Sequence, residues 1–200
     1  ADGVRVGMLL CAPAGNDLPF DEGLCEQGRN FSNKIWNAFR LIKGWEVAKV
    51  EQPESAKQAI EWFENKISKT ITEIDLSYSK YRISEALMGT YRLVWDDFCS
   101  WYLEMVKPNY GSPMDSITYA KTIEQLEKIL KLLHPFMPFL SEEIWHLIDG
   151  RKEDIIVAEW PKATTVNKQL LADFENTTEV VARIRTIRKE QNIANKEQLE

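Results

Sequence analysis

The sequence RNFSNKIWNAFRLIK, residues 29–43, decides the fold class and carries the clearest local signal in the chain. At about 100° per residue, one face of a helix here is apolar and consists of Phe31, Ile35, Ala38, Phe39 and Ile42. The opposite face presents Arg29, Asn30, Asn33, Lys34, Asn37 and Arg40. This pattern predicts an amphipathic helix that begins after an N-cap at Asp21 and ends at Gly44.

Apolar residues keep the same three-to-four spacing along most of the chain, so we expect further long helices. They are predicted from Pro53 onward, over 79–106, over 113–134, and from Ser141 as N-cap onward, with a Pro- and Gly-containing loop over 12–19. Long amphipathic helices with short connections predict an all-α fold, an antiparallel helical bundle.

Residues 154–160 depart from the helical pattern. The β-branched run Ile155-Ile156-Val157, closed by Pro161, predicts a short strand, and a polar helix over 167–191 follows it. A lone strand cannot form a sheet, so it must pack as an edge element or find partners elsewhere. We therefore predict three parts: a connecting segment over 1–20, the bundle over 21–150, and a strand with a helix over 151–200.

Composition narrows the class of protein. The 200 residues are 44% hydrophobic, enough for one real core, and no apolar run approaches the roughly 20 residues that span a bilayer. The residues that follow Ala1 lack the layout of a signal peptide, and we expect Ala1 to mark a cut inside a longer protein. Three widely spaced cysteines without a CxxC pair predict free thiols in a reducing cytoplasm. Neither His134 nor His146 has a third ligand candidate beside it, so we expect no metal site.

Charge is distributed unevenly. The net charge of -6 argues against a protein that coats nucleic acid indiscriminately, yet residues 28–44 hold four basic residues and no acid. A solvated helix normally mixes Glu with Lys, and the three asparagines lower helix propensity, so we expect a ligand to compensate. Guanidinium and amide groups suit phosphates and base edges. A basic solvent face, or a polar seam with a neighbouring helix, is the alternative.

Two further groups are candidates for binding. Aromatic residues over 95–102 are interpreted as core, and Glu104 after them can accept a hydrogen bond from a cytosine amino group. A basic cluster, Arg183, Arg185, Arg188 and Lys189, fits an RNA backbone and a solvated face equally well. A Gly-rich phosphate loop, a nucleophile motif and metal-ligand spacing are absent from the sequence, which argues against independent catalysis.

Three strings in order, RNFSNKIWNAFR (29–40), FCSWYLEMVKP (98–108) and LHPFMPFLSEEIW (133–145), resemble valyl-tRNA synthetases. The resemblance covers nearly the whole chain. Isoleucyl and leucyl synthetases share the class Ia helical anticodon-binding fold and are the nearest alternatives. A helical protein-interaction scaffold, with the Asn-rich face against a partner protein, is an alternative of another class.

The resemblance implies the anticodon-binding bundle and the start of the C-terminal region of such an enzyme. The HIGH and KMSKS signatures, which bind ATP in the family, are absent, so we expect no catalytic residue and no cofactor here; the parent enzyme would use ATP with Mg²⁺. Expected partners are the anticodon arm of valine tRNA and the catalytic and editing domains of the same chain. The parent is expected to be a cytoplasmic monomer without membrane association.

The resemblance also suggests individual roles. Residues expected in the anticodon pocket are Lys34, Arg40, Leu41, Leu103 and Glu104, while Arg29 is expected beside the anticodon stem. Asn33 and Asn37 lie on the same polar face as Lys34 and Arg40. In the basic cluster near the C-terminal end, Arg185 and Arg188 are expected to face the RNA. Valine anticodons share A and then C at their second and third positions, so Glu104 is expected to accept from that cytosine.

Overall fold

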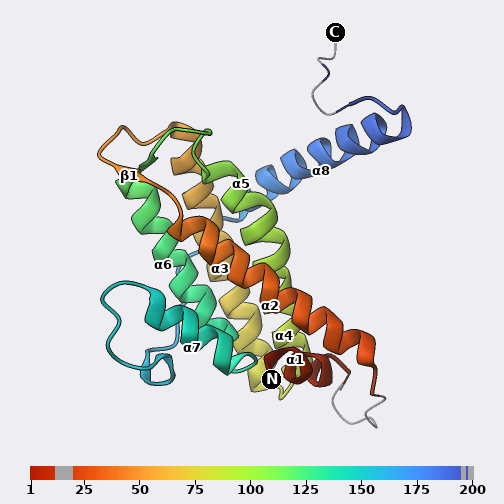
Figure 1. Cartoon of the computed structure of the whole chain (residues 1–200). Helices are drawn as coiled ribbons and strands as arrows, with labels where there is room; N and C mark the ends of the chain where they lie inside the picture. The colour runs from red at the N-terminus through yellow and green to blue at the C-terminus, as the bar shows by residue number, and fades with distance from the viewer. Residues whose placement is uncertain (12–19, 195–196, 198–200) are drawn as a thin grey trace. The chain divides into compact units, whose positions relative to one another are not determined.

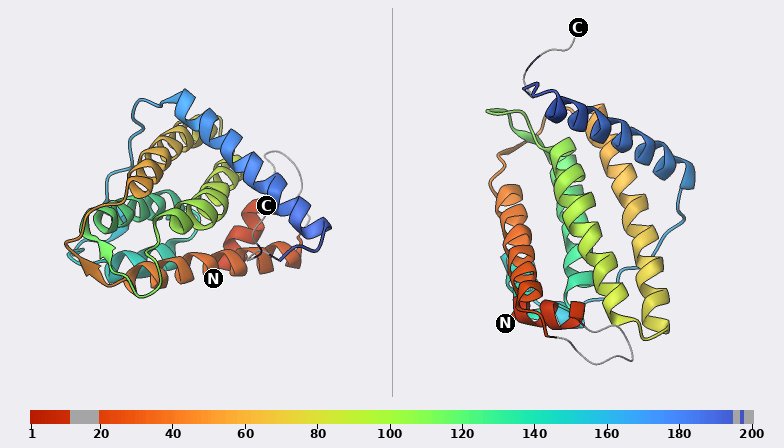
Figure 2. Two further views of the ribbon diagram at one scale, coloured as in Figure 1. Left: turned by 90° about the horizontal axis from the view of Figure 1, so that it is seen from above. Right: turned by 90° about the vertical axis from the view of Figure 1, so that its right-hand side faces the viewer.

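A computed structural model of the chain describes residues 1–11, 20–194 and 197. These residues form a larger unit, 1–165, and a smaller one, 166–200. In the larger unit, long helices run lengthwise beside one another, and the chain between them turns back at each end (Figures 1 and 2). The predicted all-α fold is therefore confirmed. The loop predicted over 12–19 lies outside the described residues.

The helix predicted from the opening stretch is α2 (Glu22–Lys43). Asp21 is its N-cap, as predicted, and its side chain accepts a hydrogen bond from the Gly23 amide at 2.8 Å. Gly44 ends the helix, also as predicted. The five predicted apolar positions, together with Gly28, are the residues that α2 buries. The helical period therefore assigned the core face of α2 correctly.

Helix α1 (Asp2–Cys11) crosses α2 at very short range. A Cβ atom added to Gly28 would lie 2.3 Å from the carbonyl oxygen of Gly3, and one added to Gly7 would lie 2.7 Å from the Cys25 amide nitrogen. The backbones of α1 and α2 thus touch where these glycines stand.

Helix α7 (Pro138–Leu147) begins earlier than predicted. Pro138 occupies its first turn, where a missing N–H costs nothing, and Ser141 lies inside the helix and donates to the Met137 carbonyl at 2.8 Å. The expectation that Ser141 is the N-cap is wrong. Asp2 of α1 caps this helix end instead, because its carboxylate accepts a hydrogen bond from the Leu140 amide at 2.7 Å.

The helix predicted over 79–106 begins later, at residue 83, and ends at residue 106 as predicted. Helix α3 (Glu54–Ser79) ends in a turn in which Tyr81 has a φ of 58°, and α4 (Ile83–Arg92) starts after it. A π-helical segment, η1 (Leu93–Tyr102), and α5 (Leu103–Val106) continue α4 without a break. The rings of Phe98 and Tyr102 lie 5.4 and 4.7 Å from that of Phe63 on α3, at the centre of the core.

Two very short strands pair in parallel, β1 (Val47–Ala48) after α2 and β2 (Met114–Asp115) after α5. The pairing joins Val47 to Met114 and Ala48 to Asp115. Asp115 also caps α6 (Ser116–Leu133) by accepting the Thr118 amide at 2.8 Å. The pair therefore brings the segments that follow α2 and α5 to the same end of the bundle (Figure 1).

The strand predicted within 154–160 is wrong. Residues Ile155–Val157 form a 3-10 turn, η2. Ile155 is buried and its two β-branched neighbours are exposed, so the segment packs through one side chain and lacks the alternation of a strand. Among the described residues the strands are β1 and β2, which pair with each other, and the run Ile155-Ile156-Val157 does not join them.

The smaller unit contains α8 (Lys168–Glu190), which the sequence predicted over 167–191. Asn167 caps it by accepting the Leu170 amide at 3.1 Å, and α8 buries none of its own residues. Within the described part of the chain, no helix combines the length and apolar character needed to cross a membrane.

The glycine contact between α1 and α2 makes a testable prediction. Gly28→Ala should lower the free energy of unfolding by about 1 to 3 kcal/mol, because the added Cβ must push the two backbones apart. Gly89→Ala is the matched control: its Cβ would meet only Ile74 at 3.8 Å, so it should stabilise α4 by roughly 0.5 to 1 kcal/mol. Urea unfolding followed by circular dichroism measures both, and equal effects of the two substitutions would contradict the close contact.

Candidate nucleic-acid interface

The polar face of α2 is the most distinctive surface of the larger unit. Its predicted members Arg29, Asn33, Asn37 and Arg40 are all exposed, and Lys34 is half-buried. Arg29 pairs with Glu26, one turn earlier, at 3.3 Å with both side chains well exposed, an arrangement worth little energy in water. From residue 28 to the helix end, the face therefore presents only cations and amides.

Aromatic rings under α2 fix the direction of this face. Phe31 packs against Tyr91 with ring centroids 4.5 Å apart, and Tyr91 stacks on Trp95 at 5.6 Å. The Lys34 ammonium lies 5.4 Å above the Trp95 ring, which is a favourable cation–π distance. Lys34 thus stands at the border between the aromatic packing and the polar face.

The end of α5 provides a second polar surface. Glu104 is exposed and its carboxylate pairs with Lys107 at 2.5 Å. It lines a groove of about 510 Å³ together with the segment 107–115 and the residues that lead into α3, among them Glu51. Hydrogen-bond donors and acceptors dominate this groove, which suits a polar ligand edge better than an apolar one.

The two leucines predicted for the pocket differ in the structure. Leu41 on α2 is 43% exposed and can support a ligand ring. Leu103 is 2% exposed and lies in the core, so the expectation that its side chain meets a base face is not met. In the turn that follows the π-helical segment, Leu103 is buried and Glu104 is exposed.

Sequence reasoning missed Tyr110. This side chain is fully exposed and lines the same groove as Glu104. The segment around Tyr110 contains Pro108, Gly111 and Pro113, which exclude a helix. Tyr110 therefore does not belong to an apolar helix face that would pack into the core. An aromatic residue within such a run was the signal that could have identified it.

Arg185 and Arg188 lie on α8 in the smaller unit, and both stay predictions as RNA contacts. The Arg188 guanidinium donates to the Ala194 carbonyl at 2.8 Å, which holds the chain after α8 back against the helix. Arg185 is exposed.

Asp97 is the least exposed acid near the aromatic packing. It lies 3.3 Å from Lys66 of α3, and burial raises the pKa of its carboxyl to about 6, although the charge of Lys66 acts in the opposite direction. Close by, burial raises the pKa of the Cys99 thiol to about 11, so Cys99 stays protonated at neutral pH. The three cysteines are free thiols, as predicted.

An exposed face of cations and amides on a helical bundle is the kind of surface that nucleic-acid-binding modules present. A family model described as the anticodon-binding domain of tRNA ligase matches residues 61–200. The chain therefore belongs to the family of anticodon-binding domains of tRNA ligases.

Curated relatives agree with this assignment, and a solved structure shares the fold. The chain is 58% identical to a valine–tRNA ligase of Christiangramia forsetii and 57% identical to one of Phocaeicola vulgatus, in both cases over 100% of the chain. It spans 23% of the length of each relative. Its fold is similar to a LeuRS of Agrobacterium radiobacter K84, solved in a ternary complex with tRNA and LeuAMS, with a TM-score of 0.57 at 15% identity over 85% of this chain and 20% of that one.

The raised pKa of Asp97 predicts how stability depends on pH. The folded state holds the Asp97 proton more tightly than the unfolded chain, so this carboxyl favours folding below about pH 4 and loses that contribution as the pH rises to about 6. The free energy of unfolding of Asp97→Asn should therefore equal that of the unsubstituted chain near pH 4 and exceed it by on the order of 1 to 2 kcal/mol above about pH 7. Urea unfolding across this range measures the difference, and a gap independent of pH would refute the assignment.

Proposed function

We propose that this chain binds the anticodon arm of valine tRNA as part of a valine–tRNA ligase, and that it catalyses no reaction alone. The observation that carries the proposal is the exposed, acid-free face of α2 between residues 28 and 43. The names and high identity of the curated relatives favour valine over the isoleucine and leucine enzymes.

Anticodon bases suit this surface because they are unstacked and can turn outward. Arg40 offers a forked donor for phosphate or a base edge, and Asn37 offers a donor beside an acceptor. Leu41, exposed beside them, provides an apolar surface for a base face. Lys34, held over Trp95, adds positive charge at the inner edge of the face.

Base choice is assigned to Glu104. A carboxylate accepts a hydrogen bond from the amino group of cytosine, a contact that contributes roughly 1 to 3 kcal/mol of discrimination. Lys107, its present partner, is itself exposed, so that it can turn to a phosphate when Glu104 meets a base. Arg29 lies nearer the N-terminal end of α2 and is assigned to the anticodon stem.

The remaining assignments concern the parent enzyme. It would ligate L-valine to tRNA with ATP and Mg²⁺ held by a catalytic body, with an editing domain in the same chain. We propose that it acts as a monomer in the cytoplasm. Arg185 and Arg188 of α8 are assigned to the RNA backbone.

Fluorescence anisotropy with a labelled anticodon stem-loop of valine tRNA tests the proposal. Arg40→Ala should weaken binding by about tenfold and reduce the salt dependence, because a cationic contact is lost. Glu104→Ala should retain most affinity but bind a stem-loop with a changed third anticodon base almost as well as the native one. Both effects follow from the roles of phosphate and base-edge contacts.

Arg82→Ala is the matched control, since Arg82 is an exposed arginine before α4 that pairs with Glu85 and lies outside the proposed surface. It should leave the affinity unchanged. Binding that ignores both anticodon sequence and salt would contradict anticodon recognition and favour the protein-interaction scaffold.

Tyr110 is proposed as a stacking platform for an anticodon-loop base next to Glu104. Tyr110→Ala should weaken stem-loop binding by roughly 1 to 3 kcal/mol, and Tyr110→Phe should not, because stacking needs the ring and not the hydroxyl. Replacing a loop base with 2-aminopurine gives a direct signal, since stacking on Tyr110 quenches its fluorescence.

Tyr81, another exposed tyrosine, supplies the control through Tyr81→Phe and Tyr81→Asn, the latter chosen because Asn tolerates its positive φ. If Tyr110→Ala binds and quenches like the parent chain while Arg40→Ala is weakened, the stacking role is wrong and the anticodon assignment stands.

A further inference from the structure

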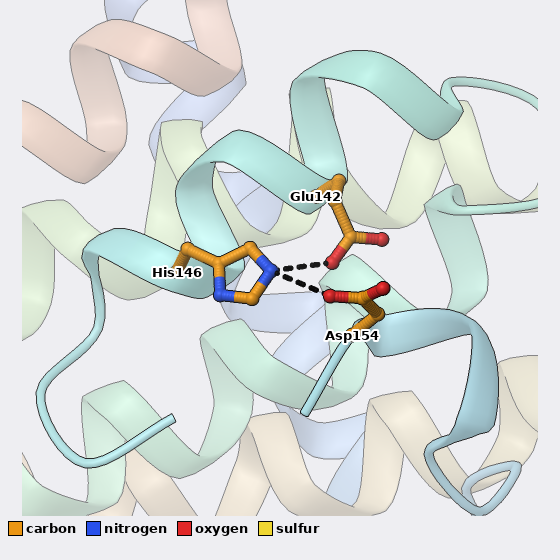
Figure 3. Close-up of side chains that lie close together, drawn as sticks. All are labelled: Glu142, His146 and Asp154. Atoms are coloured by element: carbon orange, nitrogen blue, oxygen red, sulfur yellow. Dashed lines mark hydrogen bonds and ion pairs between the residues drawn. The ribbon is translucent and has the colours of Figure 1, made fainter. Parts of the chain in front are cut away.

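Three side chains with metal-ligand chemistry converge at the C-terminal part of α7 (Figure 3). Glu142 and His146 lie one turn apart on α7, and Asp154 comes from the segment that follows it. His146 Nε2 lies 3.0 Å from Glu142 Oε1 and 3.1 Å from Asp154 Oδ1. The expectation that His146 has no further ligand candidates beside it is wrong, because the fold returns Asp154 to α7.

The surrounding contacts hold this cluster in place. The Ile155 amide donates to Glu142 Oε1 at 3.0 Å, and the Trp145 indole N–H donates to the Glu153 carbonyl at 2.9 Å. Ile155 is itself buried. The residues on both sides of Asp154 are thus fixed to α7, and Glu142 has the supporting hydrogen bond that orients metal-binding carboxylates.

The donor set favours one class of ion. An imidazole nitrogen with carboxylate oxygens suits Zn²⁺ and the neighbouring first-row dications, whereas Mg²⁺ and Ca²⁺ prefer oxygen ligands alone. With His146 neutral, the two carboxylates carry two negative charges, which a dication balances.

The distances also fit coordination. With metal–ligand bonds of about 2.0 to 2.1 Å, the two separations from His146 Nε2 correspond to N–metal–O angles of roughly 90 to 100°. Shifts of a few tenths of an ångström would open them to tetrahedral values. The three side chains are between 29% and 69% exposed, so an ion can enter and water can complete its coordination.

The hydrogen-bonded alternative is less satisfactory for these groups. If His146 Nε2 carries a proton, that single N–H must be shared between two oxygens. An ion in the place of the proton bonds to all three ligands at once.

We propose that Glu142, His146 and Asp154 bind a divalent transition-metal ion of the Zn²⁺ class. The ion cross-links the segment 148–154 to α7 and stabilises that end of the larger unit. The site uses no residue of the proposed RNA-binding surface, so it stands independently of that function.

Titration of the chelator-treated 200-residue chain with Co²⁺ and with Zn²⁺ tests the site. We expect one Co²⁺ per chain, with visible absorption stronger than that of the hydrated ion, and displacement of Co²⁺ by Zn²⁺. Saturating Zn²⁺ should raise the thermal midpoint by roughly 3 °C or more, because the ion binds only the folded chain.

Variants locate the ion. His146→Ala and Asp154→Asn should weaken binding by about tenfold or more and abolish the Co²⁺ absorption, and Glu142→Gln should weaken it while keeping an acceptor for the Ile155 amide. Glu143→Gln removes one negative charge from the same helix and should bind like the parent chain. Circular dichroism checks that each variant folds. No Co²⁺ absorption in the parent chain, or unchanged binding in both His146→Ala and Asp154→Asn, would overturn the proposal.

Discussion

The packing of Phe31 against Tyr91 and Trp95 sets the rotation of α2 about its axis, and the direction of every charged group on that helix depends on it. A rotation by one residue, about 100°, would carry cations into the core, where unpaired charge is very costly. The same rotation would expose Phe31. The aromatic contact therefore fixes both the buried side of the bundle and the face offered to a ligand, and the Lys34 ammonium over Trp95 marks the boundary between them.

The second half of the candidate surface is placed by the core as well. The β1–β2 pair joins the segments after α2 and α5, but a two-stranded pair of this length has little stability of its own. Its position is set by α2 and α5, and α5 continues η1, whose Phe98 and Tyr102 pack against Phe63 of α3. Aromatic packing thus underlies both polar surfaces: Phe31, Tyr91 and Trp95 at α2, and Phe63, Phe98 and Tyr102 before α5.

Much of this arrangement could be predicted from the sequence where local rules apply. The five buried positions of α2 follow from the helical period, and the cap Asp21 follows from a side chain that can accept a hydrogen bond from a nearby amide. Prediction failed where contacts between residues far apart in the sequence determine the local structure. The π-helical winding over 93–102 has no signature in the helical period of the sequence, and the burial of Leu103 just after it was not predicted. The β-branched run at Ile155 lacks a strand partner, and Asp154 meets His146 only because the chain turns back after α7.

The basic face of α2 is distinctive because the chain as a whole is acidic. Arg29 and Lys43, at the two ends of this face, pair with the exposed acids Glu26 and Asp149, which lie outside residues 28–44. In α6, acids and bases alternate within the helix itself, and Glu124 pairs with Lys121 and Lys128, whose hydrogen bonds hold the pKa of Glu124 below its usual value. With a net charge of -6, such mixed surfaces offer little attraction to a phosphate backbone. In the proposed function, the cations of the α2 face attract the phosphate backbone locally, within about a Debye length. The asparagines of that face would add hydrogen bonds to base edges without adding charge, so that selectivity for bases would rise without a matching rise in unselective affinity for nucleic acid.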